Sequence, residues 1–395
     1  MNYILFDDET RLSLLPFTFT RPVSESRVGI LTITEKWERC LHQPVSFFTE
    51  DFLREKFPLK MEGDNVLING SVFPDDSLVK EIGALKSGEK ICGDGFLIAA
   101  RMTGAELKKI SSFRKSDLSG SKKINAALKI SYCWDIFSIN EKALSADFQL
   151  LTKGKKSQPI SSTNRVIKPE NIFIEEGAKV ECAMLNASGG FIFIGKDAEV
   201  MEGAMIRGPF SLGKHSQIKM GAKIYGATTI GPHCKIGGEV SNSVIFGYSN
   251  KAHDGFLGNA VIGEWCNLGA DSNNSNLKNN YSQVKMWNYM EEDYVNTGLT
   301  FCGLMMGDHS KCSINTMFNT GTVVGVSANI FGTGFPPKFV PSFAWGGSEG
   351  FKTYRLEEAV EVASRVYERR GLVLDDKEQK ILKTLFEAST KFRSW

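Results

Sequence analysis

An aliphatic side chain recurs at every sixth position between residues 194 and 240. The series is Ile194, Val200, Ile206, Leu212, Ile218, Ile224, Ile230 and Ile236. If aliphatic residues fill roughly one position in five, eight such positions in a row arise by chance on the order of once in a million. An α-helix repeats every 3.6 residues and an ordinary strand every two, so neither explains this period. A short strand followed by a tight turn does, and the repeat therefore predicts a parallel β-helix.

The residues between the aliphatic positions favour the same fold. Four positions after each aliphatic residue the side chain is mostly small, as at Ala198 and Ala204, although Phe210 and Val240 are bulky exceptions. Three short strands close one triangular coil, with the aliphatic residues stacked inside and small residues at the corners. We therefore expect a left-handed β-helix.

The repeat extends beyond this first series. It begins at Ile174 and Val180, and two additional residues precede the series from Ile194. After Ile236 a second two-residue shift predicts that the inward positions are Val244, Asn250, Phe256, Ile262 and Leu268. The repeat then stops, and it returns at Met306, Cys312, Phe318, Val324 and Ile330.

The six-residue repeat is interrupted over residues 272–303, and we expect this stretch to be an insertion that leaves the β-helix. It is rich in Asn and aromatic residues. Insertions of this size on a rigid scaffold are often functional. The alternative is an arm that packs against a neighbouring subunit.

The segments outside the repeat predict three further parts. Residues 1–152 contain apolar runs such as Tyr3–Phe6 and Asn65–Asn69 between helical stretches, which is typical of an α/β domain. Residues 153–165 are polar and predict a linker to a β-helix domain over residues 166–335. Residues 336–395 begin with prolines and continue as two amphipathic helices, the second capped by Asp375. We expect these helices to cover the last coil, because an open β-helix exposes strand edges.

Charge and cysteine content exclude several classes of partner. The chain has 47 Lys and Arg against 45 Asp and Glu, a net charge of +2, which favours neither nucleic acid nor an acidic membrane surface. We expect no signal peptide, because acidic residues 7–9 follow only a short apolar run, and we expect no membrane-spanning helix, because no apolar run reaches about 18 residues. The eight cysteines include no CxxC pair, which favours reduced thiols and a cytoplasmic location.

Two histidines lie one coil apart in the repeat, at His215 and His233. We expect them to stack in a corner ladder. Zinc is the alternative, but residues on stacked coils form a line, whereas tetrahedral zinc needs convergent ligands. If the second shift is a local bulge, His253 would be a third rung of this ladder. His309 has the same expected corner position, and we predict no metal site.

The segment Leu5–Pro22 resembles the opening of sugar-phosphate nucleotidyltransferases, in which a strand leads into a Gly-rich phosphate loop that ends Gly-Thr-Arg. The resemblance implies a Rossmann-like fold with Thr10 and Arg11 as nucleotide-binding residues. The chain differs in having carboxylates at positions 7–9, where the family has glycines, and these would repel a triphosphate. The phosphate loop is therefore degenerate.

The segment Val66–Ser71 is similar to the strand of that family that ends in Gly-Asp, whose carboxylate holds magnesium. Ser71 cannot replace this ligand. The resemblance implies that the domain keeps the fold of this family but has lost its nucleotidyltransferase activity. Mg²⁺ would be a cofactor only if the domain were active. The domain could instead be structural, or could bind a sugar nucleotide without turning it over.

The segment Gly247–Gly258, with the motifs that follow it up to Ala270, resembles the acetyltransferase half of a bacterial bifunctional family. That family is the UDP-N-acetylglucosamine pyrophosphorylase/glucosamine-1-phosphate N-acetyltransferases. The resemblance implies that His253 is the catalytic base and that the backbone N–H of Ala270 contacts the acetyl-CoA thioester. The family has a Tyr where this chain has Phe256, so the acceptor sugar can differ.

The same resemblance implies a set of acceptor-binding residues. The Asn-Tyr pair of the family corresponds either to Asn276 and Leu277 or to Asn280 and Tyr281, and Lys251 and Lys278 are the nearest basic candidates for the sugar phosphate. The implied function is an acyl-CoA-dependent acyltransferase, with acetyl-CoA as co-substrate and an amino-sugar phosphate or nucleotide sugar as acceptor. The resemblance also implies a homotrimer, because the active sites of that family lie between neighbouring prisms. The alternatives are a sugar-nucleotide sensor or scaffold and a still-active nucleotidyltransferase.

Overall fold

The computed structural model describes residues 1–110, 122–124 and 127–395, which divide into two units. The N-terminal unit contains residues 1–14, 20–26 and 31–132. The β-helix unit contains residues 15–19, 27–30 and 133–395. The division by contacts thus lies at residue 132, whereas the sequence placed the domain boundary at residue 152. The reason is that the helix before residue 152 packs on the β-helix. Among the described residues, each helix is too short or too polar to span a lipid bilayer.

The N-terminal unit is an α/β fold, as predicted. Its six-stranded sheet has β1 parallel to β2 and β3, and β5 antiparallel to β3 and β4. In sheet order the strands are β2 (Ser46–Phe48), β1 (Asn2–Phe6), β3 (Asp64–Asn69), β5 (Leu97–Thr103), β4 (Lys90–Cys92) and β6 (Lys122–Lys123). The helices are α1 (Thr10–Ser13), α2 (Ile33–Leu41), α3 (Asp76–Gly83) and α4 (Gly104–Leu107). Because β1 and β3 are parallel, their carboxyl ends meet at one edge.

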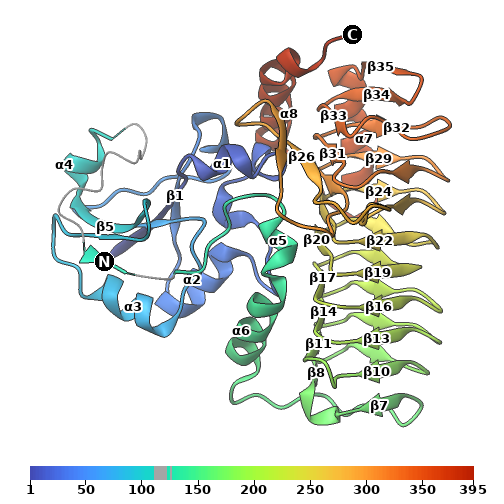
Figure 1. Ribbon diagram of the computed structural model, residues 1–395. Coiled ribbons are helices and arrows are strands. Elements are labelled where there is room, and N and C mark those ends of the chain that lie inside the picture. Colours follow the sequence, from blue (N-terminus) through green and yellow to red (C-terminus); the bar gives the residue numbers. More distant parts are fainter. Residues whose placement is uncertain (111–121, 125–126) are drawn as a thin grey trace. The chain divides into compact units, whose positions relative to one another are not determined.

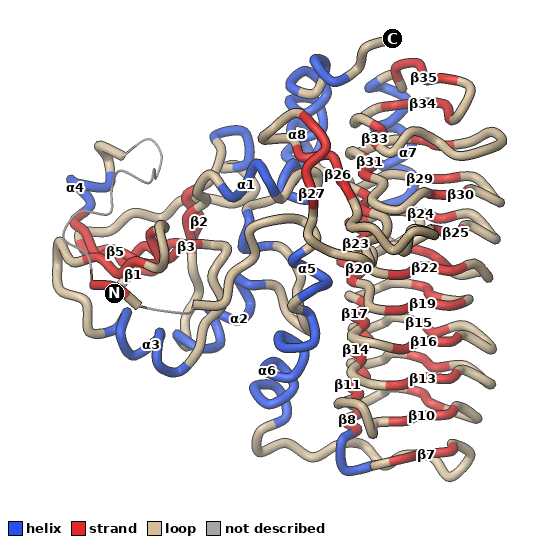
Figure 2. The backbone as a smooth tube through the Cα atoms, viewed as in Figure 1, coloured by secondary structure: helices blue, strands red, loops and turns tan. Residues whose placement is uncertain are grey.

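The β-helix unit is a left-handed parallel β-helix with three flat faces, which confirms the fold class predicted from the repeat (Figure 1). Short strands alternate with corners along the whole column (Figure 2). Face 1 comprises β7 (Arg165–Ile167), β10 (Met184–Asn186), β13 (Met205–Arg207), β16 (Lys223–Tyr225), β19 (Glu239–Ser241) and β22 (Phe256–Gly258), and then the pair β25 (Asn273–Asn274) and β30 (Met317–Phe318).

Faces 2 and 3 are longer. Face 2 comprises β8 (Ile172–Ile174), β11 (Ile192–Ile194), β14 (Phe210–Leu212), β17 (Thr228–Ile230), β20 (Val244–Gly247), β23 (Val261–Glu264), β28 (Met305–Met306), β31 (Val323–Val324) and β33 (Phe339–Val340). Face 3 comprises β9 (Lys179–Val180), β12 (Glu199–Val200), β15 (Gln217–Ile218), β18 (Lys235–Ile236), β21 (Asn250–Lys251), β24 (Asn267–Leu268), β29 (Lys311–Cys312), β32 (Asn329–Ile330), β34 (Ala344–Gly347) and the antiparallel β35 (Gly350–Thr353).

The repeated aliphatic residues form the core of the coils, as predicted for the series from Ile194 to Ile236 and for the series from Met306 to Ile330. The prediction is wrong by one position in the coil between them. Ile230 pairs with Ile245, and Ile236 pairs with Lys251, so Lys251 and Leu257 point inward in place of Asn250 and Phe256. The cause is two shorter corners, since Val240 is inward four positions after Ile236 and Ile245 follows five positions later.

The corner between faces 2 and 3 carries the predicted histidine ladder. His215 and His233 both have a left-handed backbone conformation, and their rings stack with centroids 5.0 Å apart. The next rungs are Tyr248, 4.7 Å from His233, and then Trp265, 4.2 Å from Tyr248. The third rung is therefore Tyr248, and His253 lies on another corner.

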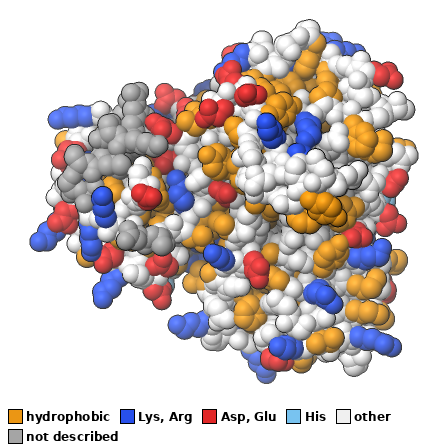
Figure 3. All heavy atoms as spheres, in the orientation of Figure 1, with side chains coloured by type: hydrophobic (Ala, Val, Ile, Leu, Met, Phe, Trp, Pro, Cys, Tyr) orange, Lys and Arg blue, Asp and Glu red, His pale blue; other side chains and the backbone are white. Residues whose placement is uncertain are grey.

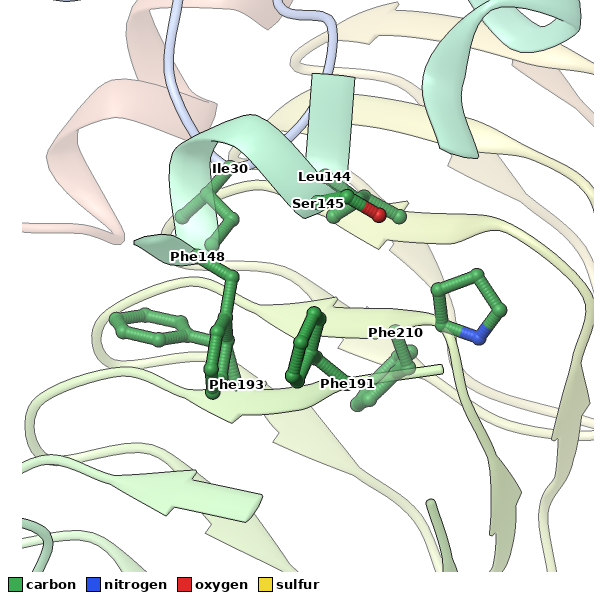
Figure 4. A pocket seen from close by; sticks show the side chains of 8 residues that line it. Ile30, Leu144, Ser145, Phe148, Phe191, Phe193 and Phe210 are labelled. Atoms are coloured by element: carbon green, nitrogen blue, oxygen red, sulfur yellow. The ribbon is translucent and has the colours of Figure 1, made fainter. Parts of the chain in front are cut away.

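Face 2 is covered by other parts of its own unit, which explains why most of its strands are apolar on both sides. Helices α5 (Asp135–Ser138) and α6 (Asn140–Thr152) precede the coils. On α6, Phe148 stacks on Phe191 with ring centroids 4.2 Å apart, beside Phe210 (Figure 4). The Asn140 amide donates to the carbonyl oxygen of Ala227 at 2.8 Å. Parallel sheets covered in this way read as continuous apolar runs.

The insertion leaves the coils after β25 and forms a hairpin of β26 (Lys285–Asn288) and β27 (Asp293–Asn296). Trp287 stacks on Phe339 of β33 with ring centroids 4.2 Å apart. Tyr289 is buried and contacts Phe392 edge to face. The aromatic residues of this hairpin therefore pack on their own chain.

The prediction that the C-terminal helices cover the last coil is wrong. The hairpin of β34 and β35 ends the column, and Phe351 of β35 packs against the core of the coils. Helices α7 (Leu356–Glu368) and α8 (Asp376–Ala388) instead share one apolar cluster with Trp265 and Phe343 of the corner between faces 2 and 3. Large aromatic side chains at this corner, including Phe343 of the last coil, provide an apolar contact surface along the side of the column. Asp375 caps α8, as predicted.

Candidate functional site

A cavity of about 800 Å³ lies on the outer side of face 3, between the coils and the end of α7. Its floor is made by one residue from each of four successive strands of face 3. Each of these residues directly precedes the inward residue of its strand, and because side chains alternate along a strand, it points outward. These floor residues are Lys235, Asn250, Asn267 and Lys311.

Helix α7 forms one side of the cavity. Tyr367 stacks on Trp265 with ring centroids 3.9 Å apart, which fixes the end of the helix against the corner. Arg369 and Arg370 follow directly and line the cavity. The Arg370 guanidinium donates to the Asn250 side-chain oxygen at 3.1 Å, so the arginine is tied to the floor.

The opposite side is the corner between faces 3 and 1, where His253, Ala270 and Ile314 line the cavity. Each of the three stands two positions after the inward residue of its coil, so they lie one above another on successive coils. The His253 side chain is exposed. Among the hydrogen bonds of the described residues, none uses the N–H of Ala270. The structure thus brings His253 and Ala270 together at one cavity.

The cavity is basic. Four cationic side chains line it, and no carboxylate does so among the described residues. Burial, together with the charge of Arg370, lowers the pKa of Lys235. Burial also lowers the pKa of Lys311. Neighbouring positive charges in a partly buried site favour a multiply charged anion as ligand.

Sequence reasoning missed all four cations of this cavity. Lys235 and Lys311 each directly precede an inward residue, so the repeat itself indicates that they point outward from face 3. Nothing in the repeat indicates that Arg369 and Arg370, more than 50 positions further on than Lys311, reach the same place. That proximity follows from the contact between Tyr367 and Trp265.

Lys251, which the sequence offered as a basic candidate for the sugar phosphate, lies inside the coil. Only 3% of its surface is exposed, and it does not line the cavity. Its Nζ donates to the carbonyl oxygens of Gly237 at 3.1 Å and His253 at 2.8 Å. Burial lowers the pKa of Lys251 to about 8.

The candidate residues of the insertion lie near the corner between faces 1 and 2, and none of them lines the cavity. The Asn276 amide donates to the Asn259 side chain at 2.8 Å. Lys278 donates to the carbonyl oxygen of Gln283 at 2.7 Å. The Asn280 side chain accepts from the N–H of Ser282 at 3.1 Å, and Tyr281 is 71% exposed.

In the N-terminal unit, Arg11 is buried and bound to its own unit. Its guanidinium donates to the carbonyl oxygen of Arg21 at 2.9 Å and lies 3.4 Å from the Asp7 carboxylate. Asp7 also accepts from the N–H of Val23. Burial raises the pKa of Asp7, and Arg11 opposes that rise. Thr10 is half-buried, and its hydroxyl accepts from Lys129 at 3.2 Å.

The edge where β1 and β3 end offers few free oxygens that could bind a magnesium ion. The Asn69 amide donates to Asp8 at 2.7 Å, and the hydroxyl of Ser71 donates to the Asn69 oxygen at 2.7 Å. Ser71 is buried, and Asp7 is paired with Arg11. Mg²⁺ requires several carboxylate or water oxygens in octahedral geometry, so these residues do not fit it.

Residues 3–156 match the family model described as sugar nucleotidyl transferase. The matched stretch includes α5 and α6 as well as the N-terminal unit. Among solved structures, the Arabidopsis UDP-N-acetylglucosamine acyltransferase is 16% identical, with a TM-score of 0.24 over 52% of this chain and 77% of that one. A polySia specific acetyltransferase, NeuO, is 13% identical, with a TM-score of 0.27 over 53% and 99% of the two chains. A hexapeptide transferase family protein from Anaplasma phagocytophilum is 15% identical, with a TM-score of 0.17 over 58% and 92%. No curated protein matches the chain.

Proposed function

We propose that this chain is an acyltransferase that moves the acyl group of acetyl-CoA to an amino-sugar phosphate or a nucleotide sugar, with His253 as general base. The observation that carries the proposal is the cavity on face 3. One wall carries the exposed imidazole of His253 and the backbone of Ala270, and the floor and opposite wall carry four cations.

The cavity suits a nucleotide thioester. Coenzyme A carries a diphosphate and a 3′-phosphate, and the cations of Lys235, Lys311, Arg369 and Arg370 provide matching charge. The volume of about 800 Å³ lies within the range of small-molecule sites. With the phosphates bound at the cations, the thioester would extend toward His253 and Ala270 on the opposite wall.

The reaction is then an acyl transfer in two steps. An acceptor amine is protonated near neutral pH and first releases that proton to solvent. The neutral imidazole of His253 then takes a second proton from the nitrogen as it attacks the thioester carbon. The N–H of Ala270 would stabilise the negative charge on the carbonyl oxygen. The C–S bond then breaks, and the imidazolium returns the proton to the leaving thiolate. The amide bond formed replaces the thioester, and free coenzyme A leaves.

The acceptor site would be completed by a second copy of the chain, in a homotrimer. The candidate acceptor residues Asn276, Lys278, Asn280 and Tyr281 lie away from the cavity of their own chain. Face 1 exposes Met184, Met205 and Tyr225 on earlier coils, at 48%, 41% and 38%. Figure 3 shows apolar side chains over this part of the β-helix, with lysines and arginines among them. A closed cyclic assembly would bury such a face. A monomeric native mass at micromolar concentration would contradict this arrangement.

The test of the function is release of thiol from acetyl-CoA in the presence of glucosamine phosphates and UDP-sugars. We expect release that depends on both substrates, and a rise in melting temperature with coenzyme A alone, because a ligand that binds the folded state stabilises it. Absence of both thiol release and stabilisation by coenzyme A would exclude the proposal.

The second candidate function belongs to the N-terminal unit, as a site that binds a sugar nucleotide without turning it over. The family-model match supports a nucleotide-binding ancestry. The pairing of Arg11 with Asp7 and the burial of Ser71 argue against catalysis, because they remove the phosphate-binding cation and the metal ligand. Stabilisation by UDP-N-acetylglucosamine without pyrophosphate release from UTP is the expected result. Pyrophosphate release at an ordinary enzymatic rate would show an active nucleotidyltransferase instead.

A further inference from the structure

A lysine interrupts the aliphatic column inside face 3. The inward residues of this column include Ile218 and Ile236 below Lys251, and Leu268 and Cys312 above it. Asn250 pairs with Asn267, which places Lys251 level with Leu268. A charged side chain at such a position is costly unless its hydrogen-bonding groups are satisfied.

The Lys251 side chain ends at a corner that is shorter than its neighbours. Four positions separate Ile236 from Val240, whereas six separate Lys251 from Leu257 on the next coil. The ammonium group reaches the shorter corner at the carbonyl of Gly237 and binds the carbonyl of His253 on its own coil. One side chain therefore ties two successive corners together.

Burial lowers the pKa of this ammonium, and the carboxylates of Asp254 and Asp271 act on it with a smaller effect in the opposite direction. Asp254 follows His253, and its carbonyl accepts from the N–H of Asp271 at 3.0 Å. The corner that carries His253 is thus held from inside by Lys251 and from the next coil by Asp271. The side chain of His253 remains exposed at the cavity.

We infer that Lys251 is a positioning residue that holds the peptide of His253 from inside the coil, so that its imidazole faces the cavity. The inference rests on the proposed function for its catalytic consequence. Its structural consequence, a fixed corner at residues 252–256, is independent of any substrate. A protonated lysine has three N–H donors and a neutral one has two, so both carbonyls stay satisfied in either state.

The test compares Lys251→Met with Leu268→Met in the full-length protein. Methionine is unbranched and apolar, so it removes the donors at little cost in volume, and Leu268 occupies the next inward position of the same column. Hydrogen exchange of peptides covering residues 252–256 should speed up roughly tenfold in Lys251→Met, because the corner loses two hydrogen bonds. Peptides covering residues 217–224 should be unchanged, and Leu268→Met should leave both regions unchanged.

Kinetic measurements on the same variants distinguish an effect on the position of His253 from an effect on acetyl-CoA binding. Lys251→Met should lower kcat by roughly tenfold to a hundredfold while KM for acetyl-CoA changes less than about threefold, since a misplaced base affects only the chemical step. Unchanged exchange at residues 252–256, or an equal effect of Leu268→Met, would overturn the inference. Faster exchange with no thioester turnover even in the unaltered protein would instead contradict the proposed function and leave the positioning role in place.

Discussion

The ring of Tyr367 stacks on the ring of Trp265 with centroids 3.9 Å apart, and this contact joins helix α7 to the middle of the β-helix. Trp265 is a rung of the corner ladder, and Tyr367 is in the last turn of α7. Because Arg369 and Arg370 follow within three residues, the stack determines where two of the four cavity cations lie.

We therefore expect Tyr367→Ala to affect stability and ligand binding together. Removing a buried aromatic side chain should lower the free energy of unfolding by about 3–5 kcal/mol. It should also weaken binding of coenzyme A, because α7 loses its anchor. Calorimetry and titration with coenzyme A measure the two effects. Val373→Ala, at an exposed site in the turn between α7 and α8, is the control. Loss of stability with unchanged coenzyme A affinity would show that α7 is not part of the binding site.

Substitution of His253 tests the general base. His253→Ala should lower turnover by roughly 10²–10⁴-fold and leave coenzyme A binding intact, because only proton transfer is lost. His215→Ala and His233→Ala should leave turnover nearly unchanged, since both belong to the corner ladder and neither lines the cavity. Steady-state kinetics of the three variants, with acetyl-CoA and the acceptor, measure these changes in turnover. Equal losses in all three variants, or none in any, would refute the assignment.

Neutralising a cavity cation should weaken the co-substrate complex. Lys235→Gln and Arg369→Gln should each raise KM for acetyl-CoA by roughly tenfold, since each removes a charged hydrogen-bond donor. Both effects should shrink as salt is added. Lys179→Gln is the matched control, because Lys179 points outward from the same face but is exposed and distant from the cavity. A similar change in Lys179→Gln would indicate a non-specific charge effect.

The buried ammonium of Lys251 should make stability depend on pH. Its folded pKa is lowered from 10.5 to about 8, so between these values the unfolded chain binds a proton that the folded chain does not. The free energy of unfolding should therefore rise with pH over that window, by about 3 kcal/mol.

It follows that Lys251→Met should be more stable than the unaltered protein at pH 7, by about 1–2 kcal/mol once the two unsatisfied carbonyls are counted. The advantage should disappear as the pH approaches 10.5, the ordinary pKa of the lysine. Urea denaturation at pH 7 and pH 10 measures the difference, with Leu268→Met as control. A variant that is less stable at pH 7 would show that the ammonium stabilises the coil.

Arg11 should prove structural. Arg11→Met leaves the buried Asp7 carboxylate without its cation and should destabilise the N-terminal unit by about 3–5 kcal/mol at neutral pH. Because burial raises the pKa of Asp7, the loss should be smaller near pH 5, where more of the carboxyl is protonated. Arg54→Met, at a partly exposed ion pair with Asp51, is the control. Thermal unfolding at both pH values is the measurement. Unchanged stability with loss of UTP binding would establish Arg11 as a nucleotide ligand.

Much of the fold follows from local pattern. The six-residue period from Ile194 to Ile236 predicts the β-helix, because a short strand and a corner repeat at that length whatever else the chain contains. The spacing of His215 and His233 predicts their stacking for the same reason. The apolar strands of the first 70 residues likewise predict the α/β sheet. These features depend on neighbouring residues and on the geometry of the backbone.

The cavity depended on tertiary structure. Which residue points inward after the short corner at Gly237 is decided by pairing with the coil below, so Lys251 and not Asn250 faces the core. The place of Arg369 and Arg370 is decided by stacking between residues about 100 positions apart in the chain. The sequence alone determined the repeating scaffold, because its period is set by local geometry. Only the tertiary structure decided which side chains share the cavity, because contacts between distant segments leave no periodic signal in the sequence.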